Sequence, residues 1–156
     1  MFSHSGDLRK GRFSEEGRIY LLTTATWERL PLFSDLMLGR VVVQAMRFQE
    51  YEDRIEGLAF VVMPDHLHWL VALQHQVTLS AVMKSVKNYS ARQIGKIQRE
   101  RGEPGHPHIW QNGFHDRALR KEDDMLAVAR YIVANPLRAG LVKRIGDYPL
   151  WDAKWM

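Results

Sequence analysis

Two histidines one residue apart, His66 and His68, interrupt a strongly apolar stretch of the chain that runs from Leu58 to Leu73. Side chains at positions i and i+2 of a β-strand point to the same face of the sheet, so a strand here would present both imidazoles side by side. Two neutral imidazole nitrogens at that spacing could bind a divalent metal ion, with further ligands from elsewhere in the chain. A pair of hydrogen-bonded, half-exposed histidines without a metal is the alternative interpretation.

Tyr131 and Asn135 are two further residues that could act beside such a metal. They lie four positions apart in an amphipathic segment, so a helix there would place them on one face. A hard ion such as Mg²⁺ or Mn²⁺ also takes oxygen ligands, and the amide oxygen of Asn135 could supply one. An activated Tyr131 hydroxyl could then attack a phosphodiester. Taken singly, a boundary tyrosine and an asparagine that ends a helix before Pro136 are the commoner interpretations.

The elements that must position these groups follow from the spacing of apolar, β-branched and capping residues. The first half of the pattern predicts a strand at 18–27, a helix from Ser34 or Asp35 to about residue 52, and strands at 55–63 and 66–74 that Pro64-Asp65 joins as a hairpin. A second helix is predicted from Thr78 or Ser80 to a Gly- and Pro-rich loop at 101–107. One or two short strands within 108–120 and a helix capped by Asp123 and Asp124 and closed by Pro136 complete the prediction. This order predicts an α+β fold of ferredoxin-like type, an antiparallel sheet with helices packed on it.

The length of 156 residues predicts a single domain over 1–156, with an N-terminal extension at 1–16 and an aromatic tail at 147–156 that needs a surface to pack against. Cysteine is absent, which excludes disulfides, thiolate metal sites and a cysteine nucleophile. No signal peptide or membrane-spanning stretch is predicted. We therefore expect a cytoplasmic protein without a membrane partner.

The net charge is +4, which alone is a weak indication of a polyanionic partner. Basic residues are concentrated in the second predicted helix and the loop after it, at Lys84, Lys87, Arg92, Lys96, Arg99 and Arg101. A solvated helix face explains such a cluster equally well. Together with aromatic residues that could stack on bases, Trp69, Trp110 and Phe114, the cluster would also suit binding of single-stranded nucleic acid.

Three sequence blocks together resemble the REP-associated tyrosine transposases, which are single-tyrosine nucleases with a histidine–hydrophobe–histidine (HUH) motif. In chain order the blocks are Met63-Pro-Asp-His-Leu-His-Trp-Leu70, Trp110-Gln-Asn-Gly-Phe-His-Asp-Arg117 and Tyr131-Ile-Val-Ala-Asn-Pro-Leu-Arg-Ala-Gly-Leu-Val142. A lone His-x-His would be weak support, but three blocks in this order are specific. The resemblance covers roughly residues 17–152 of the chain.

The resemblance implies a metal-dependent nuclease and strand transferase that acts on single-stranded DNA hairpins, the repetitive extragenic palindromes (REP). Cleavage beside the hairpin would leave a 5′-phosphotyrosine link and a free 3′-hydroxyl, and the reaction could run backwards to join strands. Position by position, His66 and His68 match the histidines that bind Mg²⁺ or Mn²⁺, Asn135 matches a third ligand, and Tyr131 matches the nucleophile. The HUH motif would lie on a central strand and Tyr131 on a C-terminal helix.

For DNA contact we expect six residues to contribute: Lys84, Lys87, Arg92, Lys96, Trp110 and Arg117. The partner would be a hairpin-forming single strand. The protein would be a monomer or a homodimer associated with the bacterial nucleoid, and in a homodimer the tyrosine helix could be exchanged between subunits.

Three alternatives remain open. Tyr89 and Gln93 are also four residues apart, and only the order of the blocks favours Tyr131 over Tyr89 as the nucleophile. A non-catalytic module that binds structured single strands would need the same basic and aromatic residues. A metal-dependent hydrolase of small molecules would need further ligands, for which His106 and His108 are the only candidates.

Overall fold

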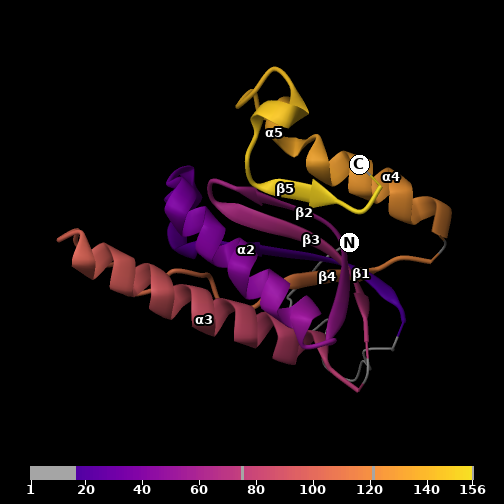
Figure 1. The fold of residues 1–156 in the computed structure, drawn as a ribbon, viewed down its shortest axis with the longest axis horizontal. Coiled ribbons are helices and arrows are strands. Elements are labelled where there is room, and N and C mark those ends of the chain that lie inside the picture. The colour runs from indigo at the N-terminus through magenta and orange to yellow at the C-terminus, as the bar shows by residue number, and fades with distance from the viewer. Residues whose placement is uncertain (1–16, 75, 121, 156) are drawn as a thin grey trace.

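The protein forms a five-stranded antiparallel sheet with helices on both faces (Figure 1). The structure, a computed structural model, describes residues 17–74, 76–120 and 122–155, so the extension expected at 1–16 lies outside the described residues. The strands are β1 (Ile19–Ala25), β2 (Ile55–Met63), β3 (His66–Leu73), β4 (His115–Ala118) and β5 (Trp151–Ala153), in the spatial order β4-β1-β3-β2-β5. The predicted ferredoxin-like α+β class is confirmed, and β3 is the central strand.

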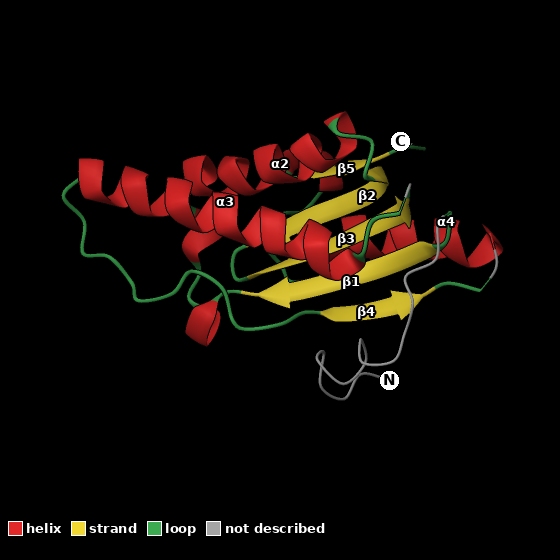
Figure 2. Ribbon diagram, turned by 90° about the horizontal axis from the view of Figure 1, so that it is seen from below, coloured by secondary structure: helices red, strands yellow, loops and turns green. Residues whose placement is uncertain are grey.

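Helices α2 (Leu36–Tyr51) and α3 (Leu79–Glu100) lie side by side on one face of the sheet, which we call the two-helix face (Figure 2). Helix α4 (Glu122–Val133) covers the opposite face, followed by the short helix α5 (Asn135–Arg138). We call this second side the α4 face. Three short 3₁₀ segments complete the described elements, at Trp27–Arg29, Leu32–Ser34 and Ile145–Asp147.

Each face of the sheet has its own hydrophobic core. Alternate residues of β3, Leu67, Trp69 and Val71, pack with α2 and α3. The intervening residues Leu70 and Ala72 belong to a second core with Ala129, Ile132 and Val133 of α4. Because strand side chains alternate between the faces, this division fixes the side on which every other β3 residue lies. His66 and His68 share the parity of Leu70, and so they lie on the α4 face.

Side-chain caps set the first residues of the two long helices. The Asp35 carboxylate accepts hydrogen bonds from the backbone N–H groups of Met37 and Leu38 at 3.0 and 3.4 Å. The Thr78 hydroxyl accepts one from the N–H of Ala81 at 3.1 Å. Both residues satisfy donors that have no partner within the first turn of a helix. The predicted starts of these two helices are therefore confirmed.

The β2–β3 hairpin presents the histidine pair at its tight end. Met63 pairs directly with His66, so Pro64 and Asp65 alone make the turn. The turn is anchored to the segment after β1, because the backbone N–H of Thr26 donates to the carbonyl of Asp65 at 2.9 Å. His66 therefore directly follows a turn that is held both by the β2–β3 pairing and by the hydrogen bond from Thr26.

Two predictions near the C-terminus differ from the structure. Helix α4 begins at Glu122, so Asp123 and Asp124 lie within its first turn and are not its cap. Pro136 does not close a helix: α4 ends at Val133, and Pro136 lies in the first turn of α5, where proline costs no hydrogen bond.

The aromatic tail adds a strand that the sequence pattern does not predict, since β5 pairs with β2 and the Tyr148 hydroxyl donates to the carbonyl of Val62 at 2.6 Å. No helix in the described part of the chain is long and apolar enough to cross a membrane.

Candidate active site

The two histidines lie next to each other on the α4 face of β3, as their spacing predicts. Their ring centroids are 4.8 Å apart, and the ring planes are inclined at 81°. The His66 side chain is 16% exposed, so it is neither fully buried nor freely solvated. The pair is thus accessible from one side and supported by the sheet on the other.

Each histidine uses its Nδ1 atom for a hydrogen bond within the protein. The Nδ1–H of His66 donates to the Asp65 carboxylate at 2.7 Å. Nδ1 of His68 shares a hydrogen bond of 2.9 Å with the hydroxyl of Thr23, which is its direct partner across the β1–β3 ladder. In a neutral imidazole only one nitrogen carries a proton, so the bond to Asp65 leaves Nε2 of His66 with a free lone pair. This arrangement is typical of histidines that bind metals, whose other nitrogen is held by a neighbouring group.

The electrostatic surroundings keep His68 neutral and Asp65 charged. The pKa of His68 is lowered to about 4, first by burial and then by neighbouring positive groups, namely His66, Arg138 and Arg29. Burial alone would raise the pKa of Asp65, but its hydrogen bonds with His66 and Arg29 outweigh this and leave it below the ordinary value. Arg29 lies 3.0 Å from the Asp65 carboxylate. A neutral imidazole is the form that binds a metal.

Asn135 brings the amide group to the histidine pair. Its Nδ2 atom lies 3.5 Å from Nε2 of His66, whose lone pair can accept a hydrogen bond from the amide N–H. A half-turn of the amide would place its oxygen at the same position, where it could act as a metal ligand beside the imidazole. The residues expected to hold Mg²⁺ or Mn²⁺ would therefore offer two imidazole nitrogens and one amide oxygen, donor types that fit such an ion. The described residues contain no group of three or more His, Cys, Asp and Glu that could hold a metal by themselves.

Tyr131 lies near the end of α4, one turn before Asn135. Its side chain is 65% exposed, whereas its neighbours Ile132 and Val133 are buried against the sheet. The guanidinium carbon of Arg138 lies 3.7 Å from the centre of the Tyr131 ring, a cation–π distance. The phenol is therefore accessible on the same side of the sheet as the histidines.

The alternative tyrosine, Tyr89, lies on the other side of the molecule. It belongs to α3, together with Gln93, and α3 packs on the two-helix face through Val82, Val86 and Ile94. The sheet thus separates Tyr89 from the histidine pair. This placement supports Tyr131 as the tyrosine that can reach a metal bound there.

Helix α3, which carries Lys84, Arg92 and Lys96, lies on the two-helix face, away from the histidines. Lys84, Arg92 and Lys96 are exposed on α3. Lys87 has a structural role, because its ammonium group donates to the carbonyls of Gln111, at 2.8 Å, and Gly113. Between α3 and the loop before β4 runs a groove of about 550 Å³, bordered by Asn88, Gly95, Arg99, His106 and His108. Any nucleic acid bound by α3 would have to extend around the sheet to reach Tyr131.

Three aromatic residues expected to stack on bases are core residues, and for Trp110 this corrects a predicted DNA contact. Trp110 is 7% exposed, its ring lies 5.2 Å from that of Phe33, and its indole N–H donates to Ser90 at 2.9 Å. Trp69 and Phe114 are equally buried. An aromatic ring in a filled core presents no free face to a base. The error arose because the partners of Trp110 come from distant parts of the chain.

Arg117 is the one expected DNA contact that lies on the face of the histidine pair. It is exposed on β4 opposite Leu21, which in turn pairs with Leu70 on β3. Directly paired strand residues share a face, so Arg117 and His68 are on the same side of the sheet. A phosphate near the histidines could reach this guanidinium.

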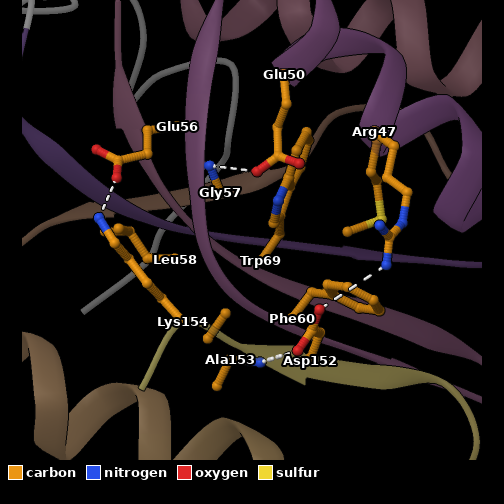
Figure 3. Close-up of a pocket in the computed structure, with 12 residues that line it drawn as sticks. Arg47, Glu50, Glu56, Gly57, Leu58, Phe60, Trp69, Asp152, Ala153 and Lys154 are labelled. Atoms are coloured by element: carbon orange, nitrogen blue, oxygen red, sulfur yellow. Dashed lines mark hydrogen bonds and ion pairs between the residues drawn. The ribbon is translucent and has the colours of Figure 1, made fainter. Parts of the chain in front are cut away.

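A separate hollow of about 340 Å³ lies at the other edge of the sheet, between α2, β2 and β5 (Figure 3). Its charged groups are paired with one another: Arg47 lies 3.8 Å from Asp152, and Lys154 forms an ion pair with Glu56. Phe60, in its floor, is paired with Trp69 on the two-helix face. With its cations already neutralised, this hollow is not a phosphate site.

Four residues of the site were not predicted: Thr23, Arg29, Asp65 and Arg138. Asp65 could have been found, since it precedes the first histidine directly. Thr23 could not, because its contact depends on the register between strands that lie 45 residues apart. Arg138 lies inside a recognised sequence block, but its stacking on Tyr131 depends on the break between α4 and α5.

Comparison with known proteins agrees with this arrangement. Residues 18–135 match the family model described as "Transposase IS200 like". A Haemophilus influenzae protein provisionally named a REP-associated tyrosine transposase is 28% identical over 99 residues, which cover 60% of this chain and 56% of that protein. A REP-associated tyrosine transposase of Escherichia coli K12 is 26% identical over 114 residues, which cover 72% of this chain and 61% of that protein. The chain thus spans less than two thirds of the length of either relative.

A solved structure has the same fold. It shows a REP-associated tyrosine transposase bound to a REP hairpin, superimposes with a TM-score of 0.70 at 23% identity, and covers 90% of this chain and 79% of the other. At this level of identity the likeness concerns the fold.

Proposed function

Because the chain belongs to the family of IS200-like transposases, we propose that it is a transposase-type enzyme that cuts and rejoins single-stranded DNA beside REP hairpins. The observation that carries the proposal is the contact between Asn135 and His66. Asn135 follows the tyrosine helix α4 directly, so this contact supports a shared site for the candidate nucleophile and the candidate metal ligands.

In the proposed reaction the Tyr131 hydroxyl attacks the phosphorus of one phosphodiester. A bond forms between the phenolic oxygen and phosphorus while the bond from phosphorus to the 3′-oxygen breaks. The phenol loses its proton, and the departing 3′-oxygen gains one. The product is a 5′-phosphotyrosine and a free 3′-hydroxyl, and attack by a 3′-hydroxyl on the phosphotyrosine reverses the step.

His66, His68 and Asn135 would hold the divalent ion. When bound there, Mg²⁺ or Mn²⁺ would supply Lewis-acid polarisation of the phosphoryl group and stabilise charge on the leaving oxygen. Asp65 and Thr23 would fix the two rings through their Nδ1 atoms, which leaves Nε2 of each imidazole as the nitrogen that could bind the ion. Both histidines are placed on one rigid central strand, which suits a site that must hold a fixed geometry.

DNA binding is expected on two surfaces. Arg117 lies on the α4 face with the histidines, whereas Lys84, Arg92 and Lys96 lie on the two-helix face. We propose that the strand being cut contacts the first surface and that the hairpin or its flanking strand reaches the second. A bound hairpin would then wrap past the β4 edge of the sheet, where the groove beside α3 begins.

The test is incubation of labelled single-stranded DNA carrying a REP hairpin with the protein and Mg²⁺ or Mn²⁺, followed by denaturing electrophoresis. We expect a protein-linked band and a fragment with a free 3′-hydroxyl. Both should disappear with a chelator and in a His66→Ala, His68→Ala double variant that retains its fold by circular dichroism. Hairpin binding by the wild type without cleavage in either metal would instead indicate the non-catalytic binding module.

A further inference from the structure

Arg138 lies directly beside the candidate nucleophile, in the short helix that also carries Asn135. It is the last residue of α5 and is exposed to solvent. Its guanidinium carbon lies 3.7 Å from the centre of the Tyr131 ring, and Asn135, at the other end of α5, lies 3.5 Å from His66.

Among the described residues, Arg138 makes no ion pair with a carboxylate, although two other arginines beside acidic groups do. Arg29 lies 3.0 Å from Asp65, and Arg101 forms an ion pair with Asp35. Within the part of the chain that the structure describes, the Arg138 guanidinium packs on the face of the Tyr131 ring, which orients it without using its N–H donors. An oriented guanidinium without a counter-ion is prepared to bind an anion.

The path of the chain explains this placement. Helix α4 ends at Val133, and the turn at Ala134 starts α5, in which the N–H of Arg138 donates to the carbonyl of Ala134 at 3.0 Å. Pro136 is buried and α5 contacts β2, so the short helix is anchored on the sheet. As a result, the Arg138 guanidinium lies over the Tyr131 ring, while Asn135 at the other end of α5 contacts His66.

We propose that Arg138 binds the non-bridging oxygens of the phosphodiester that Tyr131 attacks, and is a catalytic residue of this site. The inference rests on the proposed function and adds a substrate-binding group to it. The planar fork of an arginine can donate two parallel hydrogen bonds to two phosphate oxygens, which a lysine cannot. Negative charge on these oxygens increases as the phenolic oxygen approaches, so the contact would be stronger in the transition state than in the bound substrate.

The first experiment compares Arg138→Gln with Arg130→Gln, which removes the same charge from the exposed residue directly before Tyr131. Single-turnover formation of the protein–DNA adduct is measured at saturating hairpin DNA with Mg²⁺. We expect Arg138→Gln to slow the reaction about 100-fold, with Arg138→Lys restoring only part of the rate, and Arg130→Gln to stay near the wild-type rate. Rates for Arg138→Gln within threefold of wild type would overturn the inference and leave the proposed function intact.

A second experiment measures binding and needs no catalysis. In a Tyr131→Phe background, which keeps the ring under the guanidinium, hairpin DNA with an ordinary phosphate at the cleaved linkage is compared with DNA that carries an uncharged methylphosphonate there. The neutral linkage should weaken binding severalfold when Arg138 is present and have no further effect after Arg138→Gln. Equal losses with and without Arg138 would show that its only role is to pack on Tyr131. This result can be distinguished from failure of the proposed function, which would appear as absence of the adduct in the wild type.

Discussion

The amide nitrogen of Asn135 lies 3.5 Å from Nε2 of His66, across 69 positions of sequence. This contact joins the central strand β3 to α5, the short helix that directly follows the one carrying Tyr131. It places the amide on the imidazole nitrogen that Asp65 leaves available, and it does so within one chain. The two groups that we propose as metal ligands therefore meet within a single polypeptide.

Removing the Asn135 oxygen should weaken metal binding without unfolding the protein. Asn135→Leu removes the amide oxygen, and we expect it to lower the affinity for Mn²⁺ about tenfold or more. Asn135 is only half-buried at the start of α5, so the fold should tolerate the change. Asn135→Asp, which keeps an oxygen ligand and adds a negative charge, should bind Mn²⁺ at least as tightly as the wild type. Titration followed by the electron paramagnetic resonance of free Mn²⁺ measures both. Unchanged affinity in Asn135→Leu would remove Asn135 from the ligand set.

The Asp65 carboxylate should increase the affinity for the metal by orienting the His66 ring. Asp65→Asn can still accept a hydrogen bond from Nδ1–H of His66, but it loses the charge that favours this tautomer and the ion pair with Arg29. We expect Mn²⁺ affinity to fall about 10–100-fold, the usual range for such supporting groups. Glu56→Gln, which breaks an ion pair at the far edge of the sheet, is the control. Equal behaviour of the two variants would contradict the orienting role.

The salt dependence of DNA binding should show whether α3 contacts phosphates. Lysine and arginine release condensed counterions when they bind DNA, so neutralising both Lys84 and Arg92 with glutamine should reduce the slope of log affinity against log salt by about 1.5. Lys87 is a poor choice for this test, because it anchors the loop at Gln111 and Gly113. A slope that does not change would mean that α3 is only a solvated face. A perfect duplex of the same sequence should bind less tightly than the hairpin.

Asp35 should stabilise the fold in a pH-dependent way. The pKa of its carboxyl is lowered mainly by the hydrogen bond from Arg101, assisted by the N–H groups it caps at the start of α2. A lowered pKa in the folded state means that the stabilisation is complete well above pH 3.8, the ordinary value, and is lost as the pH falls through the folded-state pKa. Asp35→Ala should therefore cost about 1 kcal/mol of unfolding free energy at pH 7 and much less near pH 2. Thermal unfolding of both proteins at the two pH values measures this difference.

The sequence predicts those features of the fold and the site that depend on residues close together in the chain. The strand at His66 and the common face of its two histidines follow from alternation over a few residues. The helix starts at Asp35 and Thr78 follow from caps within the first turn. Asn135 was likewise placed within reach of the metal site from its spacing to Tyr131, although its contact with His66 could only be seen in the folded chain.

What sequence could not predict depends on contacts between distant segments. The basic helix and the histidines turned out to lie on opposite faces, because the face covered by α3 is decided by the strand order and not by the pattern of α3 itself. The sequence predicts an accessible ring at Trp110, but in the fold Ser90 of α3 and Phe33 pack against it. The stacking of Arg138 on its tyrosine likewise required the path of α5.

The most direct test of the proposed site compares Tyr131→Phe with Tyr89→Phe. Each change removes one oxygen and almost no volume, and both tyrosines are exposed, so folding and hairpin binding should survive in both variants. Labelled hairpin DNA is incubated with Mg²⁺ or Mn²⁺, and the protein-linked band is measured on a denaturing gel. We predict that the band is lost in Tyr131→Phe and retained in Tyr89→Phe. A band that persists in Tyr131→Phe and disappears in Tyr89→Phe would show that the nucleophile lies on the two-helix face and that the site described around His66 and His68 is not where the strand is cut.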